Sequence, residues 1–346
     1  MILLLGCSPT YSAQTKLQPP SSRQIYFGAF PDFGGSEDHV SRKQIEDFET
    51  IAGRKLVWAV FSQNWFRGIA YPKAHIHAIH NAGVIPYVRL MPRSDEIQGH
   101  SEQHFTLQRI IDGAFDADLI QWARDARADG IPILADFAVE MNGDWFPWSG
   151  VFNGGAQTDG YGDPKFPDGP ERYRDAYRHI IDLFRVQHVA HITWVFHINL
   201  ASSPDAPWNR PVNYYPGDHY IDWVGFSLYG AQTLSEPWGE LAFSTQLQSG
   251  CAAFKAITAA KPRAVLEFGV TDGYPDGNKS AWFNDAFAAI LHDKCTPFRV
   301  ISPWHEDWQN EDESWSRLRL DSSPEVKTTV RGQLHNPRFT SEAVLR

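Results

Sequence analysis

The chain has 346 residues, 42% hydrophobic and 21% charged, so it can bury the core of one large domain or two ordinary ones. Its 41 acidic and 31 basic residues give a net charge of −10, which repels phosphate backbones and anionic lipid headgroups. We therefore expect no nucleic-acid partner. The 13 Trp and 12 Tyr suit core packing, but also surfaces that hold sugars, because their rings combine a flat apolar face with a polar edge.

Residues 1–22 are interpreted as an export signal and linker. The apolar run that ends at Gly6 and Cys7, followed by a Pro/Ser-rich segment, is typical of a bacterial lipoprotein signal, whose cysteine is lipidated. A truncated secretory signal is the alternative. Both interpretations export the protein to the periplasm, the cell surface or the medium, and a lipid anchor at Cys7 is the only membrane attachment that we expect.

From residue 25 onward, short apolar runs alternate with amphipathic segments, which is typical of repeated βα units. Strands are predicted at 25–30, 55–62, 84–91, 131–140, 191–198, 221–230, 263–270 and 298–305. Helices are predicted between most of these strands and after the eighth. Eight such units predict an α/β protein with a single (β/α)8 TIM barrel over residues 23–346, and no Gly-rich dinucleotide fingerprint follows the first strand.

The remaining cysteines, Cys251 and Cys295, lie in no metal-ligand pattern, so they are buried thiols or form at most one disulfide. Residues 158–171 are acidic and rich in Gly and Pro, but their spacing matches no EF-hand, which favours a surface loop over a calcium site. We expect no metal and no cofactor, and we expect a monomer.

Catalytic groups of a TIM barrel lie at the carboxyl ends of its strands. The polar and aromatic residues at the predicted strand ends are Arg89, Glu140, His197, Tyr229, Glu267, Trp304 and His305. Two glutamates on separate strands can face each other across the barrel mouth, where hydrolysis of a glycosidic bond needs one carboxyl as proton donor and another as nucleophile or base. A lone strand-end glutamate is more often solvated or ion-paired, but two of them among many aromatic residues favour catalysis.

Several aromatic residues are candidates for stacking against pyranose rings. Those nearest the predicted glutamates are Trp145, Phe146, Trp148 and Trp304, and Trp65 after the second strand adds a more distant subsite. Their alternative role is to plug the top of the barrel. Asn142 either binds sugar hydroxyls or only forms a turn with Gly143.

Alternation along the strands adds two expectations. If Glu140 points into the barrel, Asp136 does too, and a buried carboxylate there needs a partner such as Arg89. Glu267 shares its face with Gly269, which predicts open space above the glutamate.

The motif "EMNGDWFPWSG", followed by "FSLYG", "VLEFGV" and "SPWHEDW", resembles glycoside hydrolase family 26, the β-mannanase family of a clan of retaining (β/α)8 glycosidases. The resemblance covers roughly residues 25–310. It implies that Glu140 is the general acid/base and Glu267 the nucleophile. It also implies that Tyr229 donates to the nucleophile, while Arg89 is either a second donor or structural.

The family motif reads "RPxHEMNG", and this chain lacks both its arginine and its histidine. Asp136 stands at the position of the arginine, and Val139 replaces the sugar-binding histidine just before the acid/base. The catalytic pair is unaffected, but the substrate is left open. The resemblance implies an endo-β-1,4-mannanase, with relatives acting on β-1,3/1,4-glucan, xylan or a bacterial exopolysaccharide as alternatives. A catalytically silent barrel that only binds glycans is the alternative outside enzymes.

Overall fold

The computed structural model describes residues 15–21, 23–234, 236, 242–273, 278–310 and 312–346. The lipidation site that we predict at Cys7 lies outside the described residues. No helix among the described residues is long and apolar enough to cross a bilayer.

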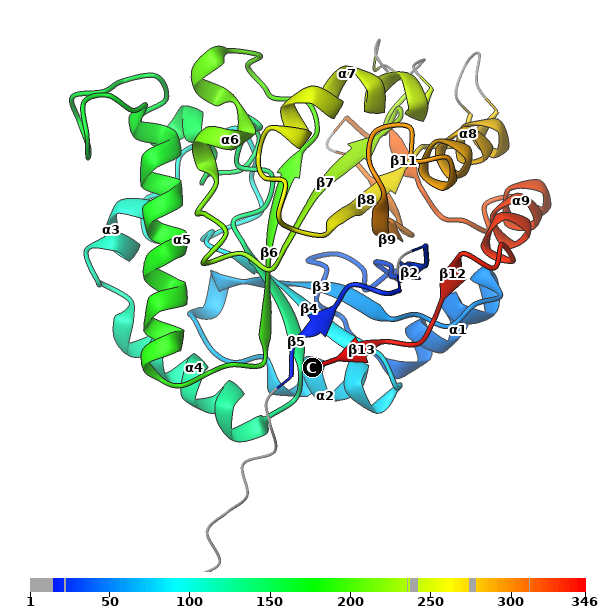
Figure 1. Cartoon of the computed structure of the whole chain (residues 1–346), viewed down its shortest axis with the longest axis horizontal. Helices are drawn as coiled ribbons and strands as arrows, with labels where there is room; N and C mark the ends of the chain where they lie inside the picture. The colour runs from blue at the N-terminus through cyan, green and yellow to red at the C-terminus, as the bar shows by residue number, and fades with distance from the viewer. Residues whose placement is uncertain (1–14, 22, 235, 237–241, 274–277, 311) are drawn as a thin grey trace, which may run out of the picture.

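Eight parallel strands surround one core, and all eight predicted strands are present with shifted ends (Figure 1). The strands are β2 (Ile25–Phe27), β3 (Trp58–Asn64), β4 (Ile85–Met91), β5 (Ile133–Phe137), β6 (Ile192–Asn199), β7 (Trp223–Tyr229), β8 (Arg263–Gly269) and β9 (Phe298–Pro303). Hydrogen bonds between Ala29 and both Trp58 and Val60 join β2 to β3 and close the ring. The predicted single-domain TIM barrel is confirmed.

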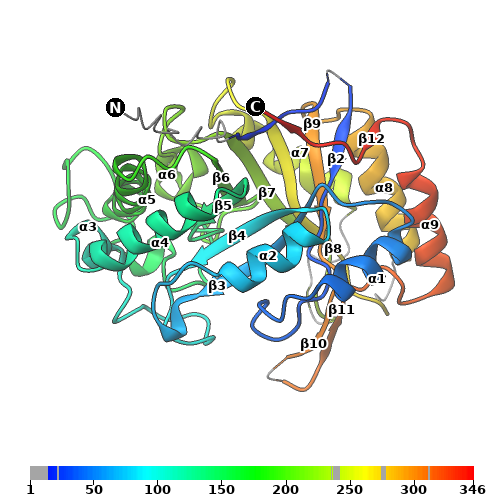
Figure 2. The same ribbon diagram turned by 90° about the horizontal axis from the view of Figure 1, so that it is seen from below.

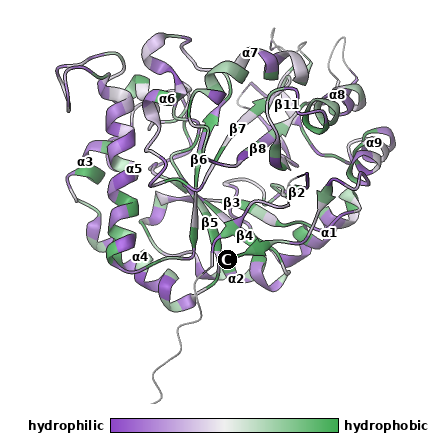
Figure 3. Ribbon diagram, in the orientation of Figure 1, coloured by the Kyte–Doolittle hydropathy of each residue, from purple (hydrophilic) through white to green (hydrophobic). Residues whose placement is uncertain are grey.

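Helices surround this barrel and turn their polar faces outward (Figure 3). They are α1 (Arg42–Ala52), α2 (Lys73–Asn81), α3 (Leu107–Ile111), α4 (Asp116–Asp129), α5 (Asp168–Val186), α6 (Pro211–Tyr214), α7 (Phe243–Lys255), α8 (Lys279–Leu291) and α9 (Pro324–Leu334). Local sequence sets several helix ends. Ser41 caps α1 by accepting a hydrogen bond from the Gln44 amide, and Gly53 and Gly130 end α1 and α4 with the positive φ that glycine tolerates.

The amino-terminal end of the barrel is closed by the chain termini. Strand β1 (Leu17–Gln18) pairs with β13 (Val344–Leu345), and Leu17 bonds to the side chains of Thr193 and Trp223. Strand β12 (Phe339–Thr340) extends the sheet beside β2. At the opposite end, β10 (Asp307–Gln309) and β11 (Trp315–Arg317) form a hairpin after β9, far from the C-terminus (Figure 2). Among the described residues, these segments cover the amino-terminal end of the barrel, whereas catalytic groups of a TIM barrel lie at its carboxyl end.

Aromatic side chains fill the barrel interior. The indole of Trp58 lies edge-on to the rings of Tyr87 and Trp223, with centroids 5.5 Å and 6.4 Å away. Gly28 makes room for it, because a Cβ there would lie 2.1 Å from the Trp58 Nε1 atom. Many of the tryptophans are thus core residues.

Cys251 of α7 and Cys295, just after α8, form a disulfide with a Cα–Cα distance of 5.6 Å. Residues 158–167 form a surface loop, whereas 168–171 are the first turn of α5, whose carboxylates bind the backbone of this loop. Asp168 accepts from the Gly160 amide at 2.9 Å, and Glu171 accepts from the Asp163 amide at 3.0 Å.

Candidate active site

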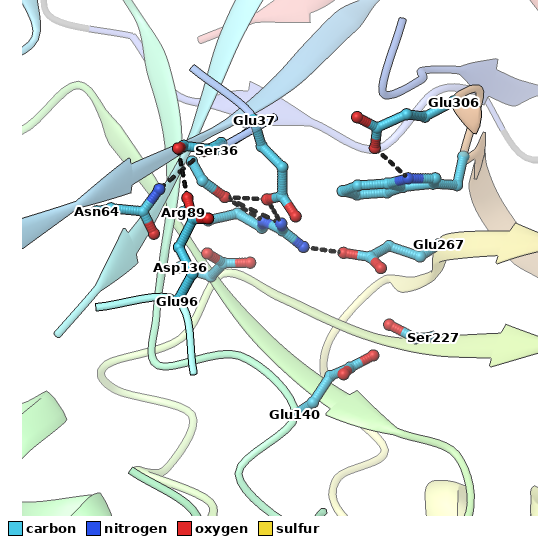
Figure 4. A network of polar contacts seen from close by, with 12 residues as sticks. Ser36, Glu37, Asn64, Arg89, Glu96, Asp136, Glu140, Ser227, Glu267 and Glu306 are labelled. Carbon is cyan, nitrogen blue, oxygen red and sulfur yellow. Dashed lines mark hydrogen bonds and ion pairs between the residues drawn. The ribbon is translucent and has the colours of Figure 1, made fainter. Parts of the chain in front are cut away.

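Glu140 and Glu267 meet at the carboxyl end of the barrel (Figure 4). One oxygen of each carboxylate and a ring nitrogen of His197 lie within 4.8 Å of one another. Both glutamates are buried, with 8% and 5% of their surface exposed. The predicted positions of the two glutamates, facing each other across the barrel mouth, are confirmed.

Glu140 lies in a turn after β5, and not on the strand itself. The strand ends at Phe137, and both Ala138 and Glu140 have positive φ, 52° and 55°. Such φ values are uncommon for residues other than glycine and cost energy that the surroundings must offset. The Ala138 amide bonds to the Leu90 carbonyl and the Glu140 amide to the His197 carbonyl, so β4 and β6 hold the turn. The strand predicted to run to residue 140 is therefore too long. The alternation of side chains along a strand does not determine the direction of the Glu140 carboxyl.

Glu267 is held by two donors. The Tyr229 hydroxyl donates to Oε2 at 2.8 Å, and the Arg89 guanidinium forms an ion pair with Oε1. Arg89 also pairs with Glu37, and its Nε and Nη2 donate to the Ser62 hydroxyl at 3.0 Å and 2.9 Å. The donor predicted at Tyr229 is present, and of the two roles left open for Arg89 the structure shows the contact with Glu267. Hydrogen bonds to a carboxylate favour its ionised form, as a nucleophile requires.

Glu140 has different surroundings. The Trp145 indole donates to its Oε2 at 2.9 Å. Burial, followed by the negative charge of Glu267, raises the pKa of Glu140, while His197, the Ser227 hydroxyl and Arg89 oppose this rise. A raised pKa lets a carboxyl keep its proton closer to neutral pH, which is what a general acid needs.

Asp136 does not pair with Arg89, and that prediction is wrong. The Asp136 carboxylate accepts from the Tyr87 hydroxyl at 2.7 Å and lies 3.1 Å from Nδ1 of His197. The other ring nitrogen of His197 lies 2.8 Å from the Ser227 hydroxyl. Asp136 and Arg89 are paired in register, but the short Asp136 chain stays in the layer of Tyr87, whereas the long Arg89 chain reaches Glu267. His197 therefore lies between the two glutamates and a buried carboxylate.

Two of the aromatic residues predicted to stack against sugar rings are core residues. Trp148 is 1% exposed, stacks on Phe146 at 4.5 Å and donates its indole hydrogen to the Val139 carbonyl at 2.7 Å. Trp65 is fully buried against Phe105. The loops fold over both rings and leave no ring face open to a ligand. The prediction that Trp148 and Trp65 bind substrate is therefore wrong.

Trp145 contacts Glu140, and Trp304 lies against Arg89, the ion-pair partner of Glu267. A Cβ at residue 143 would lie 2.5 Å from the Trp145 ring, so Gly143 lets this ring fold back over Glu140. Trp304 stacks on Phe30 at 3.9 Å, its centroid lies 4.9 Å from the Arg89 guanidinium carbon, and it is 5% exposed. The substrate contacts predicted for these two rings stay predictions.

Asn142 and Gly269 also differ from expectation. The buried Asn142 side-chain amide accepts from the Asn199 backbone amide at 3.0 Å and donates to the Asn199 carbonyl at 2.8 Å, so it ties the loop after β5 to the end of β6. A Cβ on Gly269 would lie 2.9 Å from Leu318, which fills the space predicted to be open.

Four site residues were not found from the sequence: Glu37, Ser62, Ser227 and Glu306. Ser227 lies in "FSLYG", two residues before Tyr229, and the shared strand face could have indicated it. Glu306 accepts from the Trp304 indole at 3.2 Å, and burial raises its pKa to about 7. No local pattern marks Glu37, which reaches Arg89 from the loop after β2.

The cluster of Glu140, His197 and Glu267 has the residue types of a metal site among the described residues. However, Arg89 already supplies a positive charge to Glu267, and Ser227 lies within hydrogen-bonding distance of a His197 ring nitrogen. A divalent cation would be repelled by this guanidinium. The surroundings of Glu140 and Glu267 therefore fit two carboxyl groups acting without a metal better than a metal site.

A family model, Glycosyl hydrolase family 26, matches residues 95–264, which include the Glu140 turn and end just before Glu267. This match covers just under half of the chain and agrees with the resemblance found in the sequence motifs. It is 27% identical over 293 residues to Endoglucanase H of Acetivibrio thermocellus, covering 84% of this chain and 29% of the relative. It is 25% identical over 177 residues to Mannan endo-1,4-beta-mannosidase of Bacillus subtilis, covering 51% and 40%. The chain thus spans less than half the length of these relatives.

Solved structures show the same fold. The catalytic domain of Bacillus sp. JAMB-750 GH26 endo-β-1,4-mannanase superposes with a TM-score of 0.63 at 19% identity, over 92% of this chain and 88% of that one. Bacillus subtilis mannanase BCman gives 0.58 at 18% identity, over 92% and 87%. At this identity the likeness supports the (β/α)8 fold.

Proposed function

We propose that this family 26 protein is a retaining endo-glycoside hydrolase that cleaves a β-linked polysaccharide by double displacement. The observation that supports this most is the pair of buried glutamates, whose nearest oxygens lie within 4.8 Å in unlike surroundings. Retaining enzymes hold their two carboxyl groups about 5–5.5 Å apart, whereas inverting enzymes leave about 6.5–9.5 Å for a water molecule. The short distance between these oxygens supports the retaining arrangement.

Each glutamate has a role that its surroundings suit. Glu140, protonated because burial raises its pKa, gives its proton to the leaving oxygen while the Glu267 carboxylate attacks the anomeric carbon. The glycosyl ester on Glu267 is then hydrolysed by a water molecule that loses its proton to Glu140. Arg89 and Tyr229 orient the attacking carboxylate, and Trp145 orients the acid.

For the substrate, β-1,4-mannan is the first candidate, since curated relatives named as mannan endo-1,4-beta-mannosidases match parts of the chain. A β-glucan is the second candidate. It is favoured by the match to Endoglucanase H over 84% of the chain and by Val139, which is fully buried and offers no polar contact to a sugar.

Product analysis on mannan, glucomannan, mixed-linkage glucan, xylan and native exopolysaccharides tests this proposal, with the first anomer followed by NMR. We expect oligosaccharides from one of these polymers, with the β configuration in the first product. A first product of α configuration would contradict double displacement. If no polymer is hydrolysed while one is still bound, the protein is a glycan-binding barrel.

We further propose that the protein acts outside the cytoplasm. The disulfide between Cys251 and Cys295 supports this, because such bonds persist in oxidising compartments. Globomycin treatment of a producing bacterium tests lipidation: accumulation of a precursor supports it, and unchanged processing contradicts it.

A further inference from the structure

Arg93 is a buried cation at the barrel mouth without a carboxylate partner. It follows β4 by two residues and is 7% exposed. Its Nε donates to the Asn64 side-chain oxygen at 2.7 Å, and its Nη atoms have no hydrogen bond or ion pair with any described residue. Neither Nη atom is among the enclosed atoms without a partner, so both keep some contact with solvent. A buried charge without a counter-ion is costly, so such a group is typical of a ligand site.

The acidic groups nearest to Arg93 are engaged elsewhere. Glu96 accepts from the Ser36 hydroxyl, beside Asn64 in Figure 4, and Asp95 accepts from the Ile97 amide at 2.9 Å. Neither forms an ion pair with Arg93. Burial and the positive charge of Arg89 lower the pKa of Arg93 to about 10, against a weaker opposing effect of Glu96 and Asp95.

Aromatic rings form walls around the guanidinium. Its central carbon lies 5.5 Å from the centroid of Phe66, after β3, and 6.0 Å from that of Phe146, after β5. Both rings are partly exposed. Phe146 follows Trp145, the residue that donates to Glu140, so this arrangement adjoins the catalytic acid. The Nη atoms of Arg93 have no hydrogen bond with any described residue, and the Nη edge of a guanidinium matches the two oxygens of a carboxylate.

We propose that Arg93 binds a carboxylate carried by the polysaccharide, in a subsite walled by Phe66 and Phe146. The inference rests on the proposed glycan-cleaving function and narrows its substrate to an acidic glycan. Arg89 shows the contrast within the same mouth, because it has the carboxylates of Glu37 and Glu267 as partners. For Arg93, the substrate supplies the carboxylate partner that the protein does not.

The test uses a neutral mannan or glucan that the protein hydrolyses and the same polymer with a minority of its primary hydroxyls oxidised to carboxylates. KM and kcat are measured for the wild type, Arg93→Gln, Arg93→Lys and Arg124→Gln. Arg124 is a matched control, because it is an exposed arginine on the outer helix α4. Binding of both polymers is also measured in the Glu267→Ala background, where no cleavage is expected.

We expect the wild type to bind the oxidised polymer roughly tenfold more tightly than the neutral one, which is the scale of a charge-assisted hydrogen-bonded pair. Arg93→Gln should abolish this preference, Arg93→Lys should keep part of it, and Arg124→Gln should leave it unchanged. The wild-type preference should also fall with added salt, which tests the proposal even if Arg93→Gln does not fold.

Equal binding of the two polymers by the wild type would overturn the inference. So would an equal loss for both polymers in Arg93→Gln, because Arg93 would then bind hydroxyl groups. If the wild type hydrolyses no polymer but the Glu267→Ala protein still prefers the oxidised one through Arg93, the proposed function fails and the binding site stands.

Discussion

The turn that carries Glu140 and the strand that carries Glu267 present the same side chain to one small space, with opposite electrostatic effects. Around Glu267 the partners are a guanidinium and a phenol, which stabilise the negative charge. Around Glu140 burial is the largest influence and raises the pKa, which favours the protonated form. The difference shows that identical residues acquire unlike chemistry from their neighbours, and that each neighbour can be tested separately.

The largest expected effect comes from removing the nucleophile. Glu267→Ala should lower kcat by about 10⁴-fold or more on every substrate, including aryl glycosides with good leaving groups, because no other carboxylate can attack the anomeric carbon. Steady-state assays with both substrate types check this. Hydrolysis of the aryl glycoside near the wild-type rate would contradict the role of Glu267.

Removing the acid should affect the two substrate types differently. Glu140→Ala should lower kcat on the polysaccharide by about 10² to 10⁴-fold. A good leaving group needs no proton, so the first step on an aryl glycoside should survive, and pre-steady-state measurements should show a burst of the released phenol. An equal loss in the first step for both substrates would show that Glu140 is not the proton donor.

The donors to Glu267 should matter less than the glutamate itself. Tyr229→Phe removes the 2.8 Å hydrogen bond to Oε2 and should lower kcat by roughly 10 to 100-fold, the scale of a hydrogen bond to a charged group. KM should change little. A matched loss in Tyr26→Phe, whose hydroxyl bonds to the Gln18 carbonyl at the opposite end of the barrel, would mean that the effect is only structural.

The smallest expected effect is a shift in pH dependence. The Trp145 indole donates to the Glu140 carboxylate and thereby favours its ionised form. Trp145→Phe should therefore raise the pKa of Glu140. Because the acid must be protonated, kcat/KM falls as pH rises through this pKa, so its alkaline limb should move to higher pH.

Trp308→Phe is the control for this shift, since the Trp308 indole bonds to Asn310 in the hairpin after β9. Its alkaline limb should match that of the wild type. A limb that moves to lower pH in Trp145→Phe would mean that the ring acts mainly by keeping water from Glu140.

The sequence by itself determined the barrel and the two glutamates. Hydrophobic runs at a regular spacing specify buried parallel strands, and the topology then places every strand end at one mouth, so local patterns were enough. Tyr229 was found for the same reason, because it ends a strand next to that of Glu267.

Only the tertiary structure decided which side chains face the space between these glutamates. Trp148 and Asn142 read as sugar ligands, but the loops fold over them, while Glu37 reaches Arg89 from a loop with no recognisable pattern. The left-handed turn at Ala138 and Glu140 is held by β4 and β6, which are distant in the chain. Such contacts depend on packing between segments, and no short stretch of sequence encodes them.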